Sequence, residues 1–491
     1  MNLSRRVSLN TAGQLAGRLY NSTLAFVITA LILTRQLTPA DFGIFSFHLT
    51  LYLLLANVLD FGAGTIVIRQ AARDRGGAGR LIGMLIGLKA RFALAGTLLL
   101  IGVALVFEGA GPRSALLAVA ALHLLAHAPS GAGTIFAVDM AFGRAVLAGS
   151  LGQTAWLLGT LLLLLGDVRE PAAYLLAFGL GPVVNGALSY AWAQRRVQIH
   201  FDATPQERRS LWNESWPAGV SMTMASVYFY IDAVMIRPLL GAGAAGHGTG
   251  EVAVAHYTAA YRLMTFVLML PVLFSQVVFP VFSRLWASGP ARVRPFFLRT
   301  TSFLAALGLL FPATIGLLQH DIMALIYPPD YAPGAASLGI LSLAIVFVFC
   351  AYPHVLLLLA AGHQRLMMRI SIGGAALNVA LNLWWVPRMG IEGAAWATVV
   401  TELFVLSCAA VSVWRRTGLR YTPRVLLRPL LCAGGAFALL ALLLPRLDPG
   451  SVALRVGAGI VVACGGALLS GVLPLDLGED DGGPAAVRSA P

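Results

Sequence analysis

Residues 216–237 read Trp216-Pro-Ala-Gly-Val-Ser-Met-Thr-Met-Ala-Ser-Val-Tyr-Phe-Tyr-Ile-Asp232-Ala-Val-Met-Ile-Arg237. A transmembrane helix needs about 20 mainly apolar residues, so this stretch is long enough to span a bilayer. Its one carboxylate, Asp232, lies well inside, where a charge costs at least ~2.5–3.5 kcal/mol on insertion scales. We therefore expect a membrane-spanning helix whose Asp232 faces protein or water and has a polar partner.

The rest of the chain has the same apolar character. The whole chain is 58% hydrophobic and 11% charged, whereas soluble domains are about 25% charged. Runs of spanning length recur along the whole sequence, which predicts an all-α polytopic membrane protein with 14 transmembrane helices. The runs lie at about 11–33, 42–63, 84–107, 114–138, 145–165, 171–193, 216–237, 254–282, 300–319, 335–361, 370–386, 391–413, 427–445 and 451–473.

The basic residues orient these spans. With the N-terminus in the cytoplasm, the cytoplasmic segments hold about 25 of the 34 basic residues, and the opposite loops hold about seven. Cytoplasmic loops carry an excess of Lys and Arg, so this asymmetry predicts that both termini are cytoplasmic. The net charge of +13 is then explained by membrane topology, without a nucleic-acid partner.

An internal repeat indicates two lobes. Phe142-Gly-Arg144 opens one pair of spans and Gly362-His-Gln-Arg365 opens another pair six spans later. An even offset gives two halves of the same orientation, with a cleft between them where a substrate is expected. We expect an N-lobe at 1–193, a cytoplasmic linker at 194–215, a C-lobe at 216–413, two further helices in 414–473 and a disordered cytoplasmic tail at 474–491.

Motifs of catalysis are missing from the sequence. It contains no G-x-x-x-x-G-K-[ST], H-E-x-x-H or G-x-S-x-G pattern. The four cysteines lie inside apolar runs, which argues against a disulfide framework. We expect a protein that is not an enzyme and needs no cofactor, with Na⁺ or H⁺ as a possible coupling ion.

Candidate partners for Asp232 occur on two later spans. Asn378 and Asn382 are four residues apart on one helix face, and Thr398 and Glu402 repeat that spacing on the next span. At 1.5 Å rise per residue, their depths match that of Asp232. Carboxylate, amide and hydroxyl oxygens suit Na⁺ or H⁺ rather than a transition metal. The alternative is a structural carboxylate that bonds to neighbouring hydroxyls.

Two arginine side chains inside the predicted spans suggest a phosphate-binding site. Arg18 and Arg262 are the two arginines inside spans, and a guanidinium fork binds phosphate oxygens bidentately. Snorkelling to the interface is the alternative for both. Arg35 is expected at the outer mouth. His123 and His127, four residues apart, could bind a metal or shuttle protons, although a purely structural role is the simpler interpretation.

The chain resembles the polysaccharide-export flippases of the Wzx type, members of the multidrug/oligosaccharidyl-lipid/polysaccharide (MOP) exporter superfamily. The resemblance covers essentially the whole chain and depends on the order and spacing of loose motifs. These include Leu33-Thr-Arg-Gln-Leu-Thr-Pro-Ala-Asp-Phe-Gly-Ile-Phe45, Tyr230-Ile-Asp-Ala-Val-Met-Ile236, His256-Tyr-Thr-Ala-Ala-Tyr-Arg-Leu263 and Gly390-Ile-Glu-Gly-Ala-Ala-Trp-Ala-Thr398.

The resemblance also implies a cation site. The related lipid II flippases carry one on helices 7, 11 and 12, and matching positions here are Asp232, Asn378, Asn382, Thr398 and the carbonyl of Ala394. Asn382 departs from the pattern, which has an acid there, so Na⁺ binding would need compensation from Glu402. The cationic cleft of the family maps loosely onto Arg18, Arg35 and Arg262.

These expectations describe a multi-pass transporter of the bacterial inner membrane. It would flip an undecaprenyl-pyrophosphate-linked oligosaccharide by alternating access, in contact with the lipid bilayer and with polysaccharide polymerase or assembly proteins. The first rival is a drug/cation antiporter of the same superfamily. The second is a membrane glycosyltransferase or ligase, which would need a sizeable outer loop. The longest outer loop, at about 238–253, is mostly Gly and Ala.

Overall fold

A computed structural model describes residues 3–241, 249–419, 424–448 and 450–469, and within them every regular element is helical. The expected all-α class is thereby confirmed, and the expected tail at 474–491 lies outside the described residues. The elements are α1 (Leu3–Phe26), η1 (Val27–Ile32), α2 (Leu33–Gln36), α3 (Pro39–Val58), α4 (Ala63–Arg73), α5 (Ala78–Glu108), α6 (Pro112–Leu122), η2 (His123–Ala126), α7 (His127–Ser130), η3 (Gly131–Gly133), α8 (Thr134–Val138), α9 (Phe142–Leu165), α10 (Pro171–Gln194), α11 (Pro205–Leu240), α12 (Gly250–Ala287), α13 (Pro290–Ile326), η4 (Pro329–Tyr331), α14 (Gly334–Ala360), α15 (Gln364–Thr417), α16 (Arg424–Leu443), η5 (Leu444–Arg446) and α17 (Val452–Leu469).

Twelve helices in the described part are long and apolar enough to cross a membrane. One of them, α15, contains the expected spans at 370–386 and 391–413, because its backbone leaves helical geometry at Gly390, where φ is +61°. Only glycine adopts such a conformation easily, so Gly390 separates two helical halves. The shorter α17 falls in the last expected span. The count of fourteen and the orientation of the termini stay predictions.

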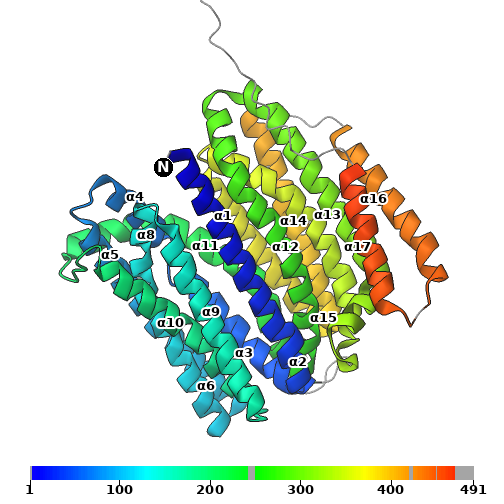
Figure 1. The fold of residues 1–491 in the computed structure, drawn as a ribbon, viewed down its shortest axis with the longest axis horizontal. Helices are drawn as coiled ribbons and strands as arrows, with labels where there is room; N and C mark the ends of the chain where they lie inside the picture. Colours follow the sequence, from blue (N-terminus) through cyan, green and yellow to red (C-terminus); the bar gives the residue numbers. More distant parts are fainter. Residues whose placement is uncertain (1–2, 242–248, 420–423, 449, 470–491) are drawn as a thin grey trace, which may run out of the picture.

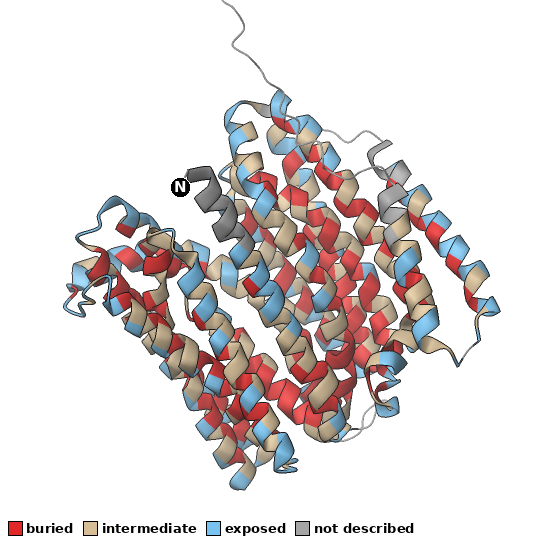
Figure 2. Ribbon diagram, in the orientation of Figure 1, coloured by how far each residue is buried: buried red, intermediate tan, exposed pale blue. Residues whose placement is uncertain are grey.

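The helices form two groups, visible in Figure 1. Helices α5, α6, α9 and α10 form one group, the N-lobe, and α12 to α15 form the other, the C-lobe, with α1 running between them. α16 and α17 pack on α13 at the outer edge of the C-lobe. Figure 2 shows buried residues concentrated inside each group, while α16 exposes Leu431 and Leu442 and α17 exposes Leu454. Exposed apolar residues in this quantity are expected of a surface that faces lipid.

The expected linker at 194–215 ends inside α11. Thr204 caps this helix with its hydroxyl, and Glu207 returns a bond to the Thr204 backbone N–H, which is a capping box. The first turns of α11 pack on the N-lobe, where Trp212 stacks on Phe61 with ring centroids 5.1 Å apart. The far half of α11 packs on α15. α11 therefore contacts both lobes, and the domain boundaries stay predictions.

The lobes meet at the end of the bundle away from the start of α1, which we call the far end. There, Arg237 of α11 donates to Glu108 of α5 at 2.6 Å and to Glu251 of α12 at 3.0 Å. His48 of α3 lies 3.1 Å from the same Glu108 carboxylate. Arg237, His48 and Glu108 are each only 5% exposed. Such a network is stable only when every charge has its partner, so it fixes how the helices meet.

Close backbone packing accompanies this network. A Cβ atom added at Gly43 of α3 would lie 1.8 Å from the carbonyl oxygen of Glu251 on α12. We therefore expect Gly43→Ala to separate α3 from α12 and to destabilise the protein by about 1–3 kcal/mol, as overpacking does. Thermal unfolding in detergent measures the effect. Gly102→Ala is the matched control, because nothing lies within 4 Å of that position. Equal melting temperatures for the two variants would contradict the close contact.

Candidate functional site

The far half of α11 positions Asp232, whose side chain is 1% exposed. The Tyr257 hydroxyl of α12 donates to Asp232 Oδ2 at 2.8 Å, and the Thr398 hydroxyl of α15 donates to the same oxygen. Asn382 Nδ2, also of α15, donates to Asp232 Oδ1 at 2.6 Å. Three neutral donors thus surround one buried carboxylate, and each of its two oxygens accepts at least one hydrogen bond.

The two halves of α15, before and after Gly390, lie side by side and both supply residues to the Asp232 cluster. Asn382 precedes Gly390 and Thr398 follows it, yet both bond to Asp232, so the halves form a hairpin around the carboxylate. Asn382 Nδ2 also contacts the carbonyl oxygen of Asn378 at 2.9 Å and its side-chain oxygen at 3.2 Å. The Thr398 hydroxyl lies 3.2 Å from the Ala394 carbonyl oxygen. The structure therefore brings Asp232, Asn378, Asn382, Ala394 and Thr398 into one cluster.

The chemistry of this cluster is that of oxygen ligands around a single charge. No group of three or more His, Cys, Asp or Glu residues that could hold a metal ion occurs in the described ranges. Both asparagines are fully buried, and Asn382 Oδ1 has no hydrogen-bond partner there. Carboxylate, amide, hydroxyl and carbonyl oxygens are hard ligands, which fit a small hard cation rather than a transition metal.

Glu402 and Tyr257 differ from the sequence-based interpretation. Glu402 is buried at 5% exposure, but no hydrogen bond or ion pair joins it to Asp232 or to any other described residue. Tyr257 is part of the cluster although sequence reasoning missed it. A comparison of depths along the two helices would have identified Tyr257, because Asp232 lies eight residues before the end of α11 and Tyr257 lies seven residues after the start of α12. Neighbouring antiparallel helices bring such positions to the same level.

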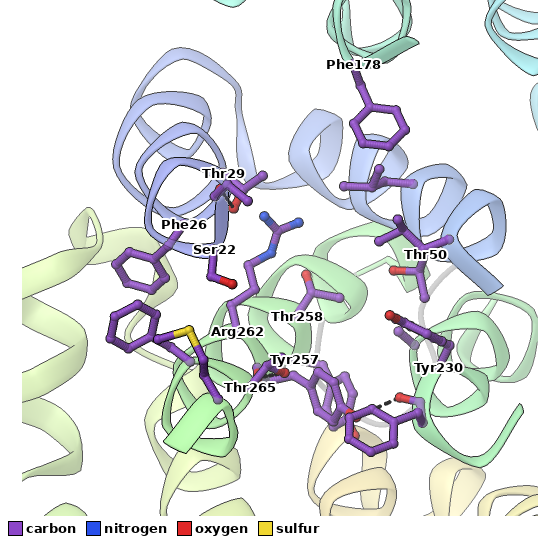
Figure 3. A pocket seen from close by; sticks show the side chains of 18 of the residues that line it. Ser22, Phe26, Thr29, Thr50, Phe178, Tyr230, Tyr257, Thr258, Arg262 and Thr265 are labelled. Carbon is purple, nitrogen blue, oxygen red and sulfur yellow. Dashed lines mark hydrogen bonds between the residues drawn. The ribbon is translucent and has the colours of Figure 1, made fainter. Parts of the chain in front are cut away.

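A cavity of about 390 Å³ lies against this cluster, between the two lobes. Ligand pockets are commonly about 300–1,000 Å³, so the cavity is large enough for a small headgroup. Its walls come from α1, η1, α3, α9 and α10 on one side and from α11 and α12 on the other. Hydroxyl groups of Ser22, Thr29, Thr50 and Thr258 face it among aromatic rings, as Figure 3 shows. The aromatic members include Phe26, Trp156, Phe178, Phe229, Tyr230 and Tyr261.

Arg262 of α12 is the cation on the wall of this cavity. Its Nη2 donates to the Ser46 hydroxyl at 3.2 Å, and its guanidinium lies 5.1 Å from the Phe42 ring centroid. None of the carboxylates in the described part forms an ion pair with it. Figure 3 shows the guanidinium between Thr29 and Thr258. Because Ser46 uses one of its five N–H donors, the others are free to bind an anion.

Arg18 and Arg35 lie outside this cavity. Arg18 is exposed on α1, and its Nη1 lies 2.6 Å from the side-chain oxygen of Gln276 when that amide is turned to accept. Arg35 of α2 donates to the Leu31 carbonyl oxygen at 2.8 Å and to that of Ile326, the last residue of α13, at 3.0 Å. Arg35 thus satisfies an open carbonyl group at a helix end. The structure brings neither arginine to Arg262.

Two curated proteins show related sequences over most of the chain. The EPS I polysaccharide export inner membrane protein EpsE of Ralstonia solanacearum is 27% identical over 352 residues, which is 70% of this chain and 79% of the relative. The protein of the same name from Ralstonia nicotianae is 26% identical over 357 residues, 71% of this chain and 79% of the relative.

Solved structures share the fold. The lipid II flippase MurJ in an inward closed conformation superposes with a TM-score of 0.71 at 14% identity, covering 94% of this chain and 98% of that one. An inward-facing multidrug resistance MATE family transporter of the MOP superfamily gives a TM-score of 0.62 at 18% identity, covering 82% and 94%. The chain therefore shares the fold of these two transporters.

The family model described as polysaccharide biosynthesis protein matches residues 8–286. This range is more than half of the chain and contains α11, with Asp232, and α12, with Tyr257 and Arg262. The chain therefore belongs to the polysaccharide biosynthesis protein family.

Proposed function

We propose that this protein moves an undecaprenyl-pyrophosphate-linked oligosaccharide across the bacterial inner membrane by alternating access of its two lobes. The name of the Ralstonia relatives, polysaccharide export inner membrane protein, supports both the location and the class of cargo. The fold shared with a lipid II flippase supports the mode of transport. The cargo would pass to polysaccharide polymerase or assembly proteins.

The observation that carries the proposal is Arg262 in the cavity between the lobes. A guanidinium without a carboxylate partner, held at membrane depth, has a high electrostatic cost that a bound anion offsets. Its fork geometry matches the oxygens of a phosphate group. The hydroxyl groups and aromatic rings around it supply hydrogen bonds and flat apolar faces for a sugar next to that phosphate. Arg18 would attract the headgroup at the cytoplasmic mouth.

The same observation argues against the drug/cation antiporter. A cavity that binds organic cations needs an available negative charge. The one carboxylate on this wall, Asp232, already accepts hydrogen bonds from three donors. The unpaired charge in the cavity is positive, which favours an anionic headgroup over a cationic drug.

Asp232 is proposed as the coupling site. Turning the Asn382 and Asn378 oxygens inward would give a cation ligands from both asparagines, Asp232, Thr398 and the Ala394 carbonyl. A cation bound there would bias the lobes toward one state if its affinity differs between the inward and outward states. We propose Na⁺ as the first ion to test, because every ligand is oxygen and the cluster carries a single negative charge.

Arg262→Ala is expected to weaken binding of an undecaprenyl-pyrophosphate-linked sugar. Hydrogen bonds to charged groups contribute about 1.5–3 kcal/mol, so the loss corresponds to roughly 10- to 100-fold in Kd. Binding to the purified protein in detergent measures it, with undecaprenol as the uncharged comparison ligand. Arg388→Ala is the matched control, because Arg388 is exposed and bonds only to Trp384. Equal losses for charged and uncharged lipids would contradict the phosphate role.

Asp232→Asn is expected to abolish the dependence of transport on a Na⁺ gradient while the protein remains folded. The measurement is translocation of the lipid-linked sugar in proteoliposomes with and without the gradient. Asp321→Asn is the matched control, since it removes a carboxylate of the same lobe whose partner is Arg455, outside the cluster. Gradient dependence that survives Asp232→Asn, or that Asp321→Asn alone removes, would assign coupling elsewhere.

A further inference from the structure

The N-lobe contains a second polar system that transport of a lipid-linked sugar does not use. Beginning at the far end, it runs through Glu108, His48, Tyr52, His127, Lys89 and Asp60. Lys89 is the single lysine of the chain, and His127 belongs to the histidine pair noted in the sequence. Ionisable residues inside a membrane protein are costly to bury, so a buried series of them is a candidate for an ion or proton pathway.

The first part of this series lies on α3. His48 Nε2 lies 3.1 Å from Glu108 Oε1, and Tyr52 follows His48 by one helical turn on the same face. His48 and Tyr52 both line a cavity of about 20 Å³ whose other walls are apolar. A water molecule needs roughly 10–15 Å³ and polar partners, so this cavity can hold one between the two side chains.

The second part continues toward the end where α1 begins. The rings of Tyr52 and His127 are 5.8 Å apart, and Tyr52 Oη and His127 Nε2 are both buried without a hydrogen-bond partner among the described residues. Orphaned buried polar atoms of this kind are rare and require an explanation. Lys89 is the charged neighbour of His127, and its Nζ lies 3.4 Å from Ser130 and 3.6 Å from Asp60.

The two ends of the series approach solvent. Asp60 follows α3 in a turn and is 32% exposed. At the far end, Glu108 is the last residue of α5 and bonds to Arg237, which also pairs with Glu251, exposed at 27%. Arg113 of α6 is a further charged neighbour of Glu108. These groups set the charge around the far entrance, while Tyr52 and His127 lie in the buried middle.

We propose that this series is a proton pathway through the N-lobe, separate from the Asp232 cluster. The Glu108 carboxylate takes up a proton and passes it to Nε2 of His48 in the Nδ1–H tautomer, and His48 releases its Nδ1 proton toward the small cavity. The Tyr52 hydroxyl accepts a proton as it gives its own to His127 Nε2. His127 passes a proton to Lys89 Nζ as Lys89 releases one of its own Nζ protons to the Asp60 carboxylate. One proton enters and one leaves, and a turn of each imidazole ring then restores the starting tautomers of His48 and His127.

A pathway that lies within one lobe has a consequence that can be tested directly. Proton movement along it needs neither the cargo nor rocking of the lobes. Proteoliposomes that contain the wild-type protein, a trapped pH-sensitive dye and no Na⁺ or lipid-linked sugar are expected to take up protons faster than protein-free liposomes under a K⁺ diffusion potential. This result is independent of the proposed cargo, so failure of one proposal leaves the other intact.

Two conservative variants locate the pathway. Tyr52→Phe keeps the ring and removes the hydroxyl, and His127→Gln removes the imidazole. Each is expected to lower the proton flux roughly tenfold or more, which corresponds to about 1.4 kcal/mol in the barrier. Because the Tyr52 hydroxyl has no partner among the described residues, Tyr52→Phe should not lower the melting temperature.

The controls are a tyrosine and a histidine of the same lobe outside the series. Tyr174→Phe removes a hydroxyl that bonds to the Val168 carbonyl oxygen at 2.7 Å. His123→Gln changes the neighbour that packs against Gly179 of α10. Both should retain the wild-type flux. If the wild-type protein takes up protons no faster than empty liposomes, or if Tyr52→Phe and His127→Gln keep its flux, the series is a structural polar core and the proposal is wrong.

Discussion

The structure of the C-lobe depends on how the Asp232 carboxylate is satisfied. An uncompensated charge at this depth would cost several kcal/mol, so each of its oxygens must accept hydrogen bonds. The donors Tyr257, Thr398 and Asn382 come from α12 and from both halves of α15. One side chain thereby fixes three helical segments around α11. It also requires the hairpin at Gly390, since without that reversal Asn382 and Thr398 could not reach the same carboxylate.

The same electrostatic rule separates structural charges from functional ones. Arg237 is as deeply buried as a core residue, but two carboxylates and two aromatic rings surround it, so its role in joining the lobes is complete without a ligand. Arg262 has a hydroxyl and one aromatic ring but no carboxylate in the part of the chain that the structure describes. The difference between these two arginines, and not their number, is what supports the proposed anion site in the cavity.

Sequence reasoning could predict what depends on depth and helical period. Asp232, Asn382 and Thr398 were expected at one level because spacing and rise per residue are local quantities, and the structure places them in contact. Contacts that depend on how the helices tilt, and on which face each helix presents to its neighbour, could not be predicted from the sequence. Arg35 bonds to the last carbonyl group of α13 and does not line the cavity. The partners of Arg237, Glu108 and Glu251, could not be assigned because they belong to different lobes.

The two lobes satisfy their buried polar groups in different ways, and this difference bears on the mechanism proposed for each lobe. In the C-lobe, the Asp232 cluster is compact and both carboxylate oxygens accept hydrogen bonds, so a cation that enters must replace those bonds and will shift the helices that supply them. In the N-lobe, the polar groups from Glu108 to Asp60 form an extended series with unpartnered atoms in the middle. Such a series can pass a proton with little movement of its helices. A site that moves helices and a path that leaves them in place can therefore operate in one molecule, with the proposed anion site in the cavity between them.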